Sequence, residues 1–156
     1  MTVSYWDFDG AERTGEIVVH ADYATDVVSV FDALFTARFP IAQMRLVDDF
    51  GGDDDRSMAA NNTSGFNCRA ATGSDAWSEH AYGRAIDINP IQNPFVTASG
   101  DVIPPAGEAH RDRDVTEPGL ITSDGPVVAA FAGIGWQWGG EWARGQDYQH
   151  FSVSGR

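Results

Sequence analysis

Cysteine is nearly absent from this sequence. Cys68 is the single cysteine among 156 residues, so an internal disulfide and a cysteine-based metal site are both excluded. It lies in a short segment with Phe66, and we expect it to be a buried small residue rather than a reactive thiol. A lone cysteine is also compatible with a partner outside this chain.

Long apolar runs and cationic residues are scarce as well. No stretch of about 18 apolar residues occurs, so we expect no membrane span. The first seven residues have neither the basic region nor the apolar core of a secretion signal. Ten cationic and 23 acidic residues give a net charge of −13, which favours solubility and repels nucleic acid and anionic membranes. No repeat or long linker divides residues 1–156, which we therefore expect to form a single domain.

Helices and short strands are expected to occur without regular alternation. The apolar spacing predicts a helix from about residue 22 to Arg38, whose inner face carries Val27, Val30, Phe31, Leu34 and Phe35. Shorter helices are predicted at 53–61 and 127–132, and a mostly irregular excursion at 91–125. The predicted strands are 15–20, 41–47, 64–69, 84–89, 136–138 and 148–153. This order favours an α+β fold with a small, mainly antiparallel sheet and flanking helices.

Polar residues in two short segments carry the chemistry. The first segment, 78–87, contains His80 and Asp87, and the second, 147–151, contains Asp147 and His150. Asp87 lies in a predicted strand, on the face opposite its isoleucine neighbours, and a carboxylate buried there needs a partner. If the two strands are neighbours in one sheet, both histidines and Asp87 converge.

Two imidazoles and one carboxylate suit zinc and leave a fourth position for water. Asp147 precedes His150 by three residues, a spacing that allows it to reach this water as a general acid/base. Each residue alone has an ordinary alternative, such as a core histidine or a turn-capping aspartate. His20 and His110 have no such neighbours and are not expected to bind metal.

Two other patterns have structural explanations that we favour. The run of aspartates at 53–55 is expected to be a solvated helix start rather than a calcium site. The tryptophans Trp136, Trp138 and Trp142 fit core or rim packing somewhat better than a platform for substrate.

The two site segments resemble the zinc peptidases of the VanY type. The pattern is Ser-x-His-x-x-Gly-x-Ala-x-Asp at 78–87, followed by Asp-x-x-His at 147–150. These enzymes are D-alanyl-D-alanine carboxypeptidases and related L-alanyl-D-glutamate endopeptidases of bacterial cell walls. The similarity extends over about residues 14–153 and includes 61–63, 66–69, 77–83, 87–90, 93–94 and 135–142. The fold it implies is the small α+β fold shared by DD-peptidases and the Hedgehog signalling domain.

The resemblance also implies a role for individual residues. It implies one Zn²⁺ per chain, with Asp147 as the catalytic acid/base and the ligands His80, Asp87 and His150. Arg69 would face the substrate, either polarising the scissile carbonyl or holding a carboxylate, because its donors are fixed and always charged. The remaining candidates for substrate contact are Ser78, Tyr82 and Trp138.

We therefore expect a monomeric zinc peptidase acting on peptidoglycan stem peptides, with D-Ala-D-Ala carboxypeptidase as the preferred activity. An L-Ala-D-Glu endopeptidase of the lysin type is one alternative, and a non-catalytic binding domain with a structural zinc is another. The substrate implies an extracytoplasmic location, with the signal segment absent from this chain, unless the protein is a phage lysin. Similar proteins carry an upstream cysteine that could pair with the position of Cys68.

Overall fold

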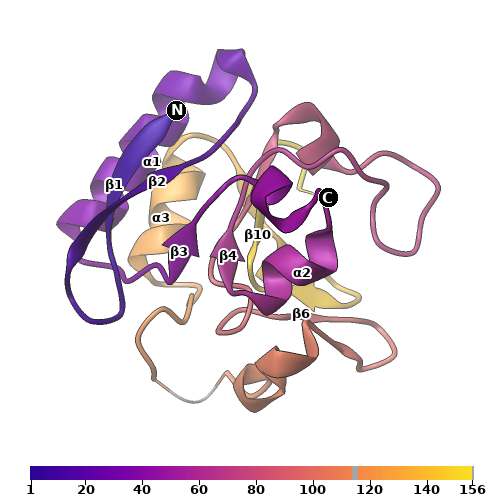
Figure 1. Ribbon diagram of the computed structural model, residues 1–156. Helices are drawn as coiled ribbons and strands as arrows, with labels where there is room; N and C mark the ends of the chain where they lie inside the picture. The colour runs from indigo at the N-terminus through magenta and orange to yellow at the C-terminus, as the bar shows by residue number, and fades with distance from the viewer. Residues whose placement is uncertain (114–115, 156) are drawn as a thin grey trace.

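Small β-sheets packed with α-helices make up the architecture, which confirms the predicted α+β class. The computed structural model describes residues 1–113 and 116–155, and its course is drawn in Figure 1. Within these residues no helix is long and apolar enough to cross a lipid bilayer. The α-helices and strands are β1 (Thr2–Trp6), β2 (Glu12–Glu16), α1 (Ala24–Thr36), β3 (Gln43–Met44), α2 (Asp54–Ala59), β4 (Asn62–Thr63), β5 (Ala85–Asp87), β6 (Phe95–Val96), β7 (Val102–Ile103), α3 (Pro126–Gly133), β8 (Gln137–Trp138), β9 (Gln146–Asp147) and β10 (His150–Ser152). Short 3-10 helices lie at Ala21–Tyr23, Val47–Phe50, Glu79–Tyr82, Pro105–His110 and Gly139–Glu141.

The β1–β2 hairpin covers helix α1 at one end of the molecule, with α3 beside it (Figure 1). The predicted long helix is confirmed as α1, and its buried residues are Val27, Val30, Phe31 and Leu34. Sequence analysis did not identify β1, because its two core residues, Val3 and Tyr5, form too short an alternation to stand out. The strand predicted at 15–20 overlaps β2 only at its first two residues.

A three-stranded antiparallel sheet in the order β5-β10-β8 lies at the centre of the fold. Its register pairs His150 with Asp87 and Phe151 with Ile86. Ile86 and Phe151 are fully buried, and Phe151 stacks on Phe131 of α3 with ring centroids 4.1 Å apart. This apolar contact fixes the register, because a shift of one residue would turn the core side chains outward. The same register places the His150 and Asp87 side chains on the opposite face.

The strands between α1 and the central sheet are shorter than predicted. The expected strand 41–47 reduces to β3, which pairs in parallel with β4. The expected strand 64–69 is not formed: Ser64 makes an isolated bridge to Asp87 and the chain then continues without a ladder. The helix predicted at 53–61 is confirmed as α2, and Asp53 caps it by accepting a 3.0 Å hydrogen bond from the Arg56 amide.

The long excursion predicted at 91–125 is mostly irregular over its described residues, 91–113 and 116–125, and it includes two short strands and the 3-10 helix Pro105–His110. Residues 114–115 lie outside the described part of the chain. Strand β6 pairs on one side with β7 and on the other with β9, so that Phe95 lies opposite Asp147. The excursion therefore supports the strand that carries the candidate acid/base.

Asn93 fastens this excursion to the central sheet. Its buried side-chain amide donates to the carbonyls of Ile88, Asn89 and Gly119. Its oxygen accepts from the Ile121 amide at 2.8 Å and from Arg113 at 3.0 Å. One side chain thus forms hydrogen bonds with backbone groups of four residues between positions 88 and 121.

Cys68 is exposed, which contradicts the prediction that it is a buried small residue. The chain is extended from Gly65 to Cys68, and its side chains alternate between the interior and solvent. Asn67 occupies the inward position, whereas Phe66 and Cys68 point outward. Apolar neighbours in the sequence therefore did not indicate burial here.

We expect Asn93→Ala to lower the free energy of unfolding by about 3 kcal/mol, because it removes hydrogen bonds from several buried backbone groups and one of the contacts of Arg113. Urea denaturation followed by tryptophan fluorescence measures this change. Ser99→Ala, in the exposed part of the same excursion, is the control and should stay within about 0.5 kcal/mol of the wild type. Equal midpoints for Asn93→Ala and the wild type would refute the assigned role.

Candidate active site

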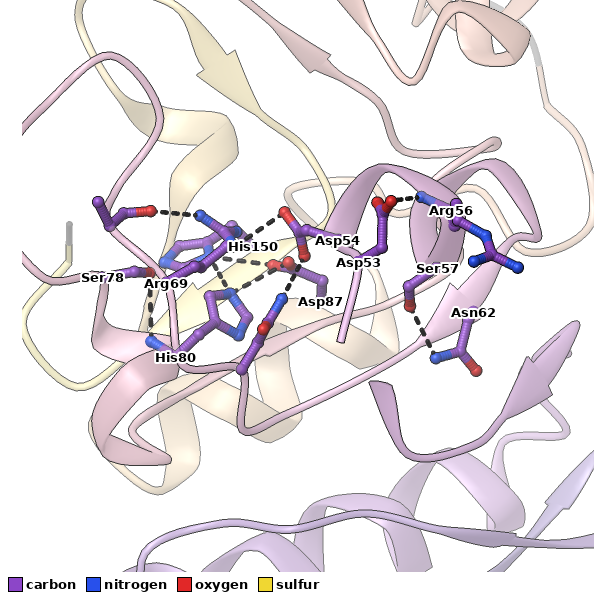
Figure 2. Close-up of polar contacts among 12 residues, drawn as sticks. Asp53, Asp54, Arg56, Ser57, Asn62, Arg69, Ser78, His80, Asp87 and His150 are labelled. Atoms are coloured by element: carbon purple, nitrogen blue, oxygen red, sulfur yellow. Dashed lines mark hydrogen bonds and ion pairs between the residues drawn. The ribbon is translucent and has the colours of Figure 1, made fainter. Parts of the chain in front are cut away.

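Three buried side chains from separate segments meet at one point. The Nε2 atom of His80 lies 3.0 Å from Asp87 Oδ2 and 3.2 Å from His150 Nδ1. His150 Nδ1 in turn lies 3.0 Å from Asp87 Oδ1. Figure 2 shows both imidazoles pointing toward the carboxylate. The sequence prediction that these three residues could converge across two neighbouring strands corresponds to this arrangement.

Local backbone structure orients His80. Ser78 caps the 3-10 helix Glu79–Tyr82, and its Oγ accepts a hydrogen bond from the His80 amide at 3.2 Å. Gly83 ends the helix with φ of 63°, and an added Cβ would lie 2.6 Å from the His20 nitrogen. The Nδ1 atom of His80 lies 2.6 Å from the Gly65 carbonyl. Because a carbonyl only accepts, Nδ1 carries a proton, which leaves Nε2 as the ring atom that faces Asp87.

The carboxyl group of Asp87 is the anionic member of this cluster. Burial alone raises its pKa, but the two histidines outweigh that effect and hold the pKa below its usual range. Asp87 is therefore ionised whenever the cluster is intact, as a metal ligand must be.

The cluster fits a metal ion. One nitrogen or oxygen atom from each residue can be chosen so that all lie within 4.8 Å of one another. Ligand atoms of a tetrahedral ion with bonds of about 2.0 Å are separated by about 3.3 Å, close to the distances given above. The hydrogen bond from His80 to a backbone carbonyl is the usual outer support of a metal-binding imidazole. Across the described residues, no fourth histidine, cysteine or carboxylate joins the group.

Asp147 lies beside the cluster, on strand β9. Its side chain is half-buried, and its Oδ1 atom is buried without a hydrogen-bond partner among the described residues. Burial raises the pKa of Asp147 to about 7, despite the opposing influence of His150. A carboxyl group that changes protonation near neutral pH can both accept and return a proton.

A cavity of about 430 Å³ opens in front of these residues. His80, His150 and Asp147 line it together with Arg69. The remaining wall comes from the loop around residues 71–79 and from Phe95 and Trp142. The cavity is thus lined by the two histidines of the cluster, by the Asp147 carboxylate and by the Arg69 guanidinium.

Arg69 is held by an acidic partner from another element. Its Nε atom lies 2.8 Å from Oδ2 of Asp54, in the first turn of α2, and its Nη1 donates to the Ala70 carbonyl at 3.1 Å (Figure 2). The expectation of a fully solvated acidic run at 53–55 is therefore wrong for Asp54, whose side chain is turned inward. Asp53 behaves as expected of a helix start, and Asp55 is exposed.

The other candidates for substrate contact lie in different surroundings. Ser78 lines the cavity and also caps the 3-10 helix that carries His80. Tyr82 is exposed outside the cavity lining, with the Arg84 guanidinium over its ring. Trp138 does not line the cavity: it packs in the core, and its indole donates to the Tyr148 carbonyl at 2.9 Å. Substrate contact at Trp138 stays a prediction, and its neighbour Trp142 is a residue that lines the cavity.

Sequence reasoning missed Asp54, Trp77 and Phe95 as residues near the centre. The sequence does not single out Asp54, because its neighbours are also aspartates and only tertiary packing distinguishes it from them. Trp77 was part of the resemblance but was given no role, although it lines the cavity and is 60% exposed. His20 and His110 lie outside the cluster, as expected.

Comparison with known protein families gives one match. A family model described as D-alanyl-D-alanine carboxypeptidase matches residues 72–153, a span that contains His80, Asp87, Asp147 and His150. Comparison with curated proteins and with solved structures gives no significant match.

Gly139 is expected to be essential for the geometry. A Cβ on this residue would lie 2.7 Å from the Asp147 carbonyl oxygen and 3.3 Å from the His150 Cβ. Gly139→Ala should therefore displace both strands and weaken metal binding about 10- to 100-fold, as measured by competition with a chromogenic chelator. Gly133→Ala, where a Cβ meets nothing within 4 Å, is the matched control. Unchanged metal affinity in Gly139→Ala would contradict this packing constraint.

The raised pKa of Asp147 predicts a pH-dependent stability for the metal-free protein. Between about pH 4 and pH 7 the folded state keeps a proton that the unfolded state has lost, so the free energy of unfolding decreases as the pH rises. Asp147→Asn removes this ionisation. In the presence of chelator it should be more stable than the wild type by roughly 2 kcal/mol at pH 8 and equal to it near pH 4. Denaturation curves across this range test the sign, and a variant less stable at pH 8 would contradict it.

Proposed function

The chain belongs to the D-alanyl-D-alanine carboxypeptidase family of peptidases, and we propose that it is a zinc-dependent enzyme acting on the peptide stem of bacterial peptidoglycan. The observation that carries this proposal is the three-residue cluster whose two histidines line a cavity together with Asp147 and Arg69. The preferred activity is removal of a terminal D-alanine. Such a substrate lies outside the cytoplasmic membrane, and we propose an extracytoplasmic location for the protein.

The ligand set supports zinc as the metal. Two neutral imidazoles and one carboxylate are a common catalytic combination for Zn²⁺, and the absence of a fourth ligand among the described residues leaves room for substrate or water. When bound, Zn²⁺ supplies Lewis-acid polarisation and makes hydroxide available at neutral pH. This arrangement favours an enzyme over a scaffold domain, in which a structural zinc is usually enclosed by four protein ligands.

Two further side chains would act on the scissile amide. Asp147 would accept a proton from the attacking water as the new carbon–oxygen bond forms. It would return that proton to the amine nitrogen as the carbon–nitrogen bond breaks. Arg69 would donate to the carbonyl oxygen that gains negative charge, or to the terminal carboxylate of the substrate. His80, Asp87 and His150 would hold the metal throughout.

An endopeptidase that cuts between L-alanine and D-glutamate is the second candidate. It uses the same chemistry but needs space for peptide on both sides of the cleaved bond. The wide cavity and the exposed Trp77 on its wall support this alternative. The products of the reaction distinguish the two activities.

Defined muropeptides incubated with the protein and analysed by mass spectrometry test the proposal. We expect cleavage that a chelator abolishes and added zinc restores, with loss of D-alanine or a cut after L-alanine identifying the activity. Asp147→Ala should keep the metal and lose at least about 100-fold in kcat/KM, because Glu79, the other described carboxylate that lines the cavity, is paired with Arg84.

His80→Ala should lose the metal, as measured by elemental analysis, whereas His20→Ala, on the exposed surface, should retain it. Full metal occupancy in His80→Ala would remove this residue from the ligand set. Failure of the zinc-loaded wild type to cleave any of these substrates would favour a binding domain instead.

A further inference from the structure

Asp54 is the one residue of the acidic run 53–55 that turns toward the cavity. It lies in the first turn of α2, where Asp53 serves as the cap and Asp55 faces solvent. The Asp54 side chain is only 20% exposed. Because helix capping is already provided by Asp53, the inward position of a second carboxylate needs another explanation.

Both oxygens of Asp54 bind the segment that leads to the cavity. Oδ2 lies 2.8 Å from Arg69 Nε, and Oδ1 accepts a 2.8 Å hydrogen bond from the amide of Asn67, itself buried. Figure 2 shows this carboxylate between α2 and the two imidazoles, with Arg69 reaching over it. The carboxylate therefore ties the 67–69 backbone and the Arg69 head group to one helix.

The contacts of Arg69 leave one end of its guanidinium for the cavity. Nε faces Asp54 and Nη1 donates to the Ala70 carbonyl, while Nη2 has no polar partner in the described part of the chain. The side chain is 23% exposed and lines the cavity. A guanidinium held by the ion pair with Asp54 and by the Ala70 carbonyl keeps its remaining donors in a fixed direction, which a freely rotating arginine does not.

The pairing also separates Arg69 from a competing carboxylate. Asp147 lines the same cavity, and one of its oxygens is buried without a partner. A guanidinium released from Asp54 would have the Asp147 carboxylate as an alternative partner, and an ion pair there would occupy the proposed base. An anion on α2 therefore keeps the proposed electrophilic group and the proposed base apart.

We infer that Asp54 is a positioning residue, which acts through Arg69 to aim the guanidinium into the cavity and keep it away from Asp147. The inference rests on the proposed peptidase function for its kinetic consequence, but the Asp54–Arg69 pairing is independent of that function. Asp54 itself touches neither the cluster nor, in this role, the substrate.

A double-mutant cycle on the zinc-loaded protein tests the kinetic consequence. Asp54→Asn should keep its zinc and lower kcat/KM about 10- to 100-fold, and Asp54→Glu should recover part of this loss. Asp55→Asn, the same charge change in the same helical turn, should match the wild type. In an Arg69→Ala background, Asp54→Asn should cost less than about twofold, because the group it positions is gone. Equal losses in both backgrounds would overturn the inference.

A measurement of the Arg69 guanidinium protons separates this inference from the proposed function. In zinc-loaded wild type and Asp55→Asn, proton–nitrogen NMR should show a slowly exchanging Arg69 guanidinium signal, identified by its loss in Arg69→Lys. The signal should exchange rapidly in Asp54→Asn, and its persistence there would overturn the inference. If the wild type shows no peptidase activity, the proposed function fails, while this signal still reports whether Asp54 holds Arg69.

Discussion

The burial of the Asp87 carboxylate is the constraint on which the rest of the structure depends. Asp87 is 4% exposed in a central strand, a position where an unpaired charge costs several kcal/mol. Two imidazoles offset this cost, each at 3.0 Å from one carboxylate oxygen. The turn at Gly83 brings His80 back to Asp87, and the pairing of β5 with β10 brings His150 to it. The fold must therefore bring these segments together or leave a charge unsatisfied in its interior.

This requirement links the apolar core to the polar cluster. The stacking of Phe151 on Phe131 and the burial of Ile86 set the register of the central sheet, and that register alone places His150 opposite Asp87. The long excursion then adds β6, against which β9 is aligned, so that Asp147 faces the same cavity. Asp147 and His150 lie three residues apart on the consecutive strands β9 and β10, so the candidate base and one candidate ligand are positioned together.

Patterns that depend on local chemistry could be predicted from the sequence. The amphipathic helix α1, the capping role of Ser78 and the α+β class follow from spacing and from residue types with a known backbone preference. The burial of Cys68 was predicted wrongly, because the direction of a side chain in an irregular segment depends on which neighbours it alternates with. The Asp54–Arg69 pair spans 15 positions without periodicity, so only tertiary structure reveals it.

Asp147 illustrates why the residue at a functional site is often not the one that would stabilise the fold best. A buried carboxylate oxygen without a partner destabilises the fold, and an amide or an apolar residue of similar size would remove that cost. The same property raises its pKa toward neutrality, where proton transfer to and from water is most effective. Asp54 presents the opposite solution, since both of its oxygens are satisfied by groups that lead to the cavity. The two aspartates thus differ in their contacts. Asp147 has an oxygen without a hydrogen-bond partner and can transfer a proton, whereas Asp54 is engaged by its neighbours and holds them in place.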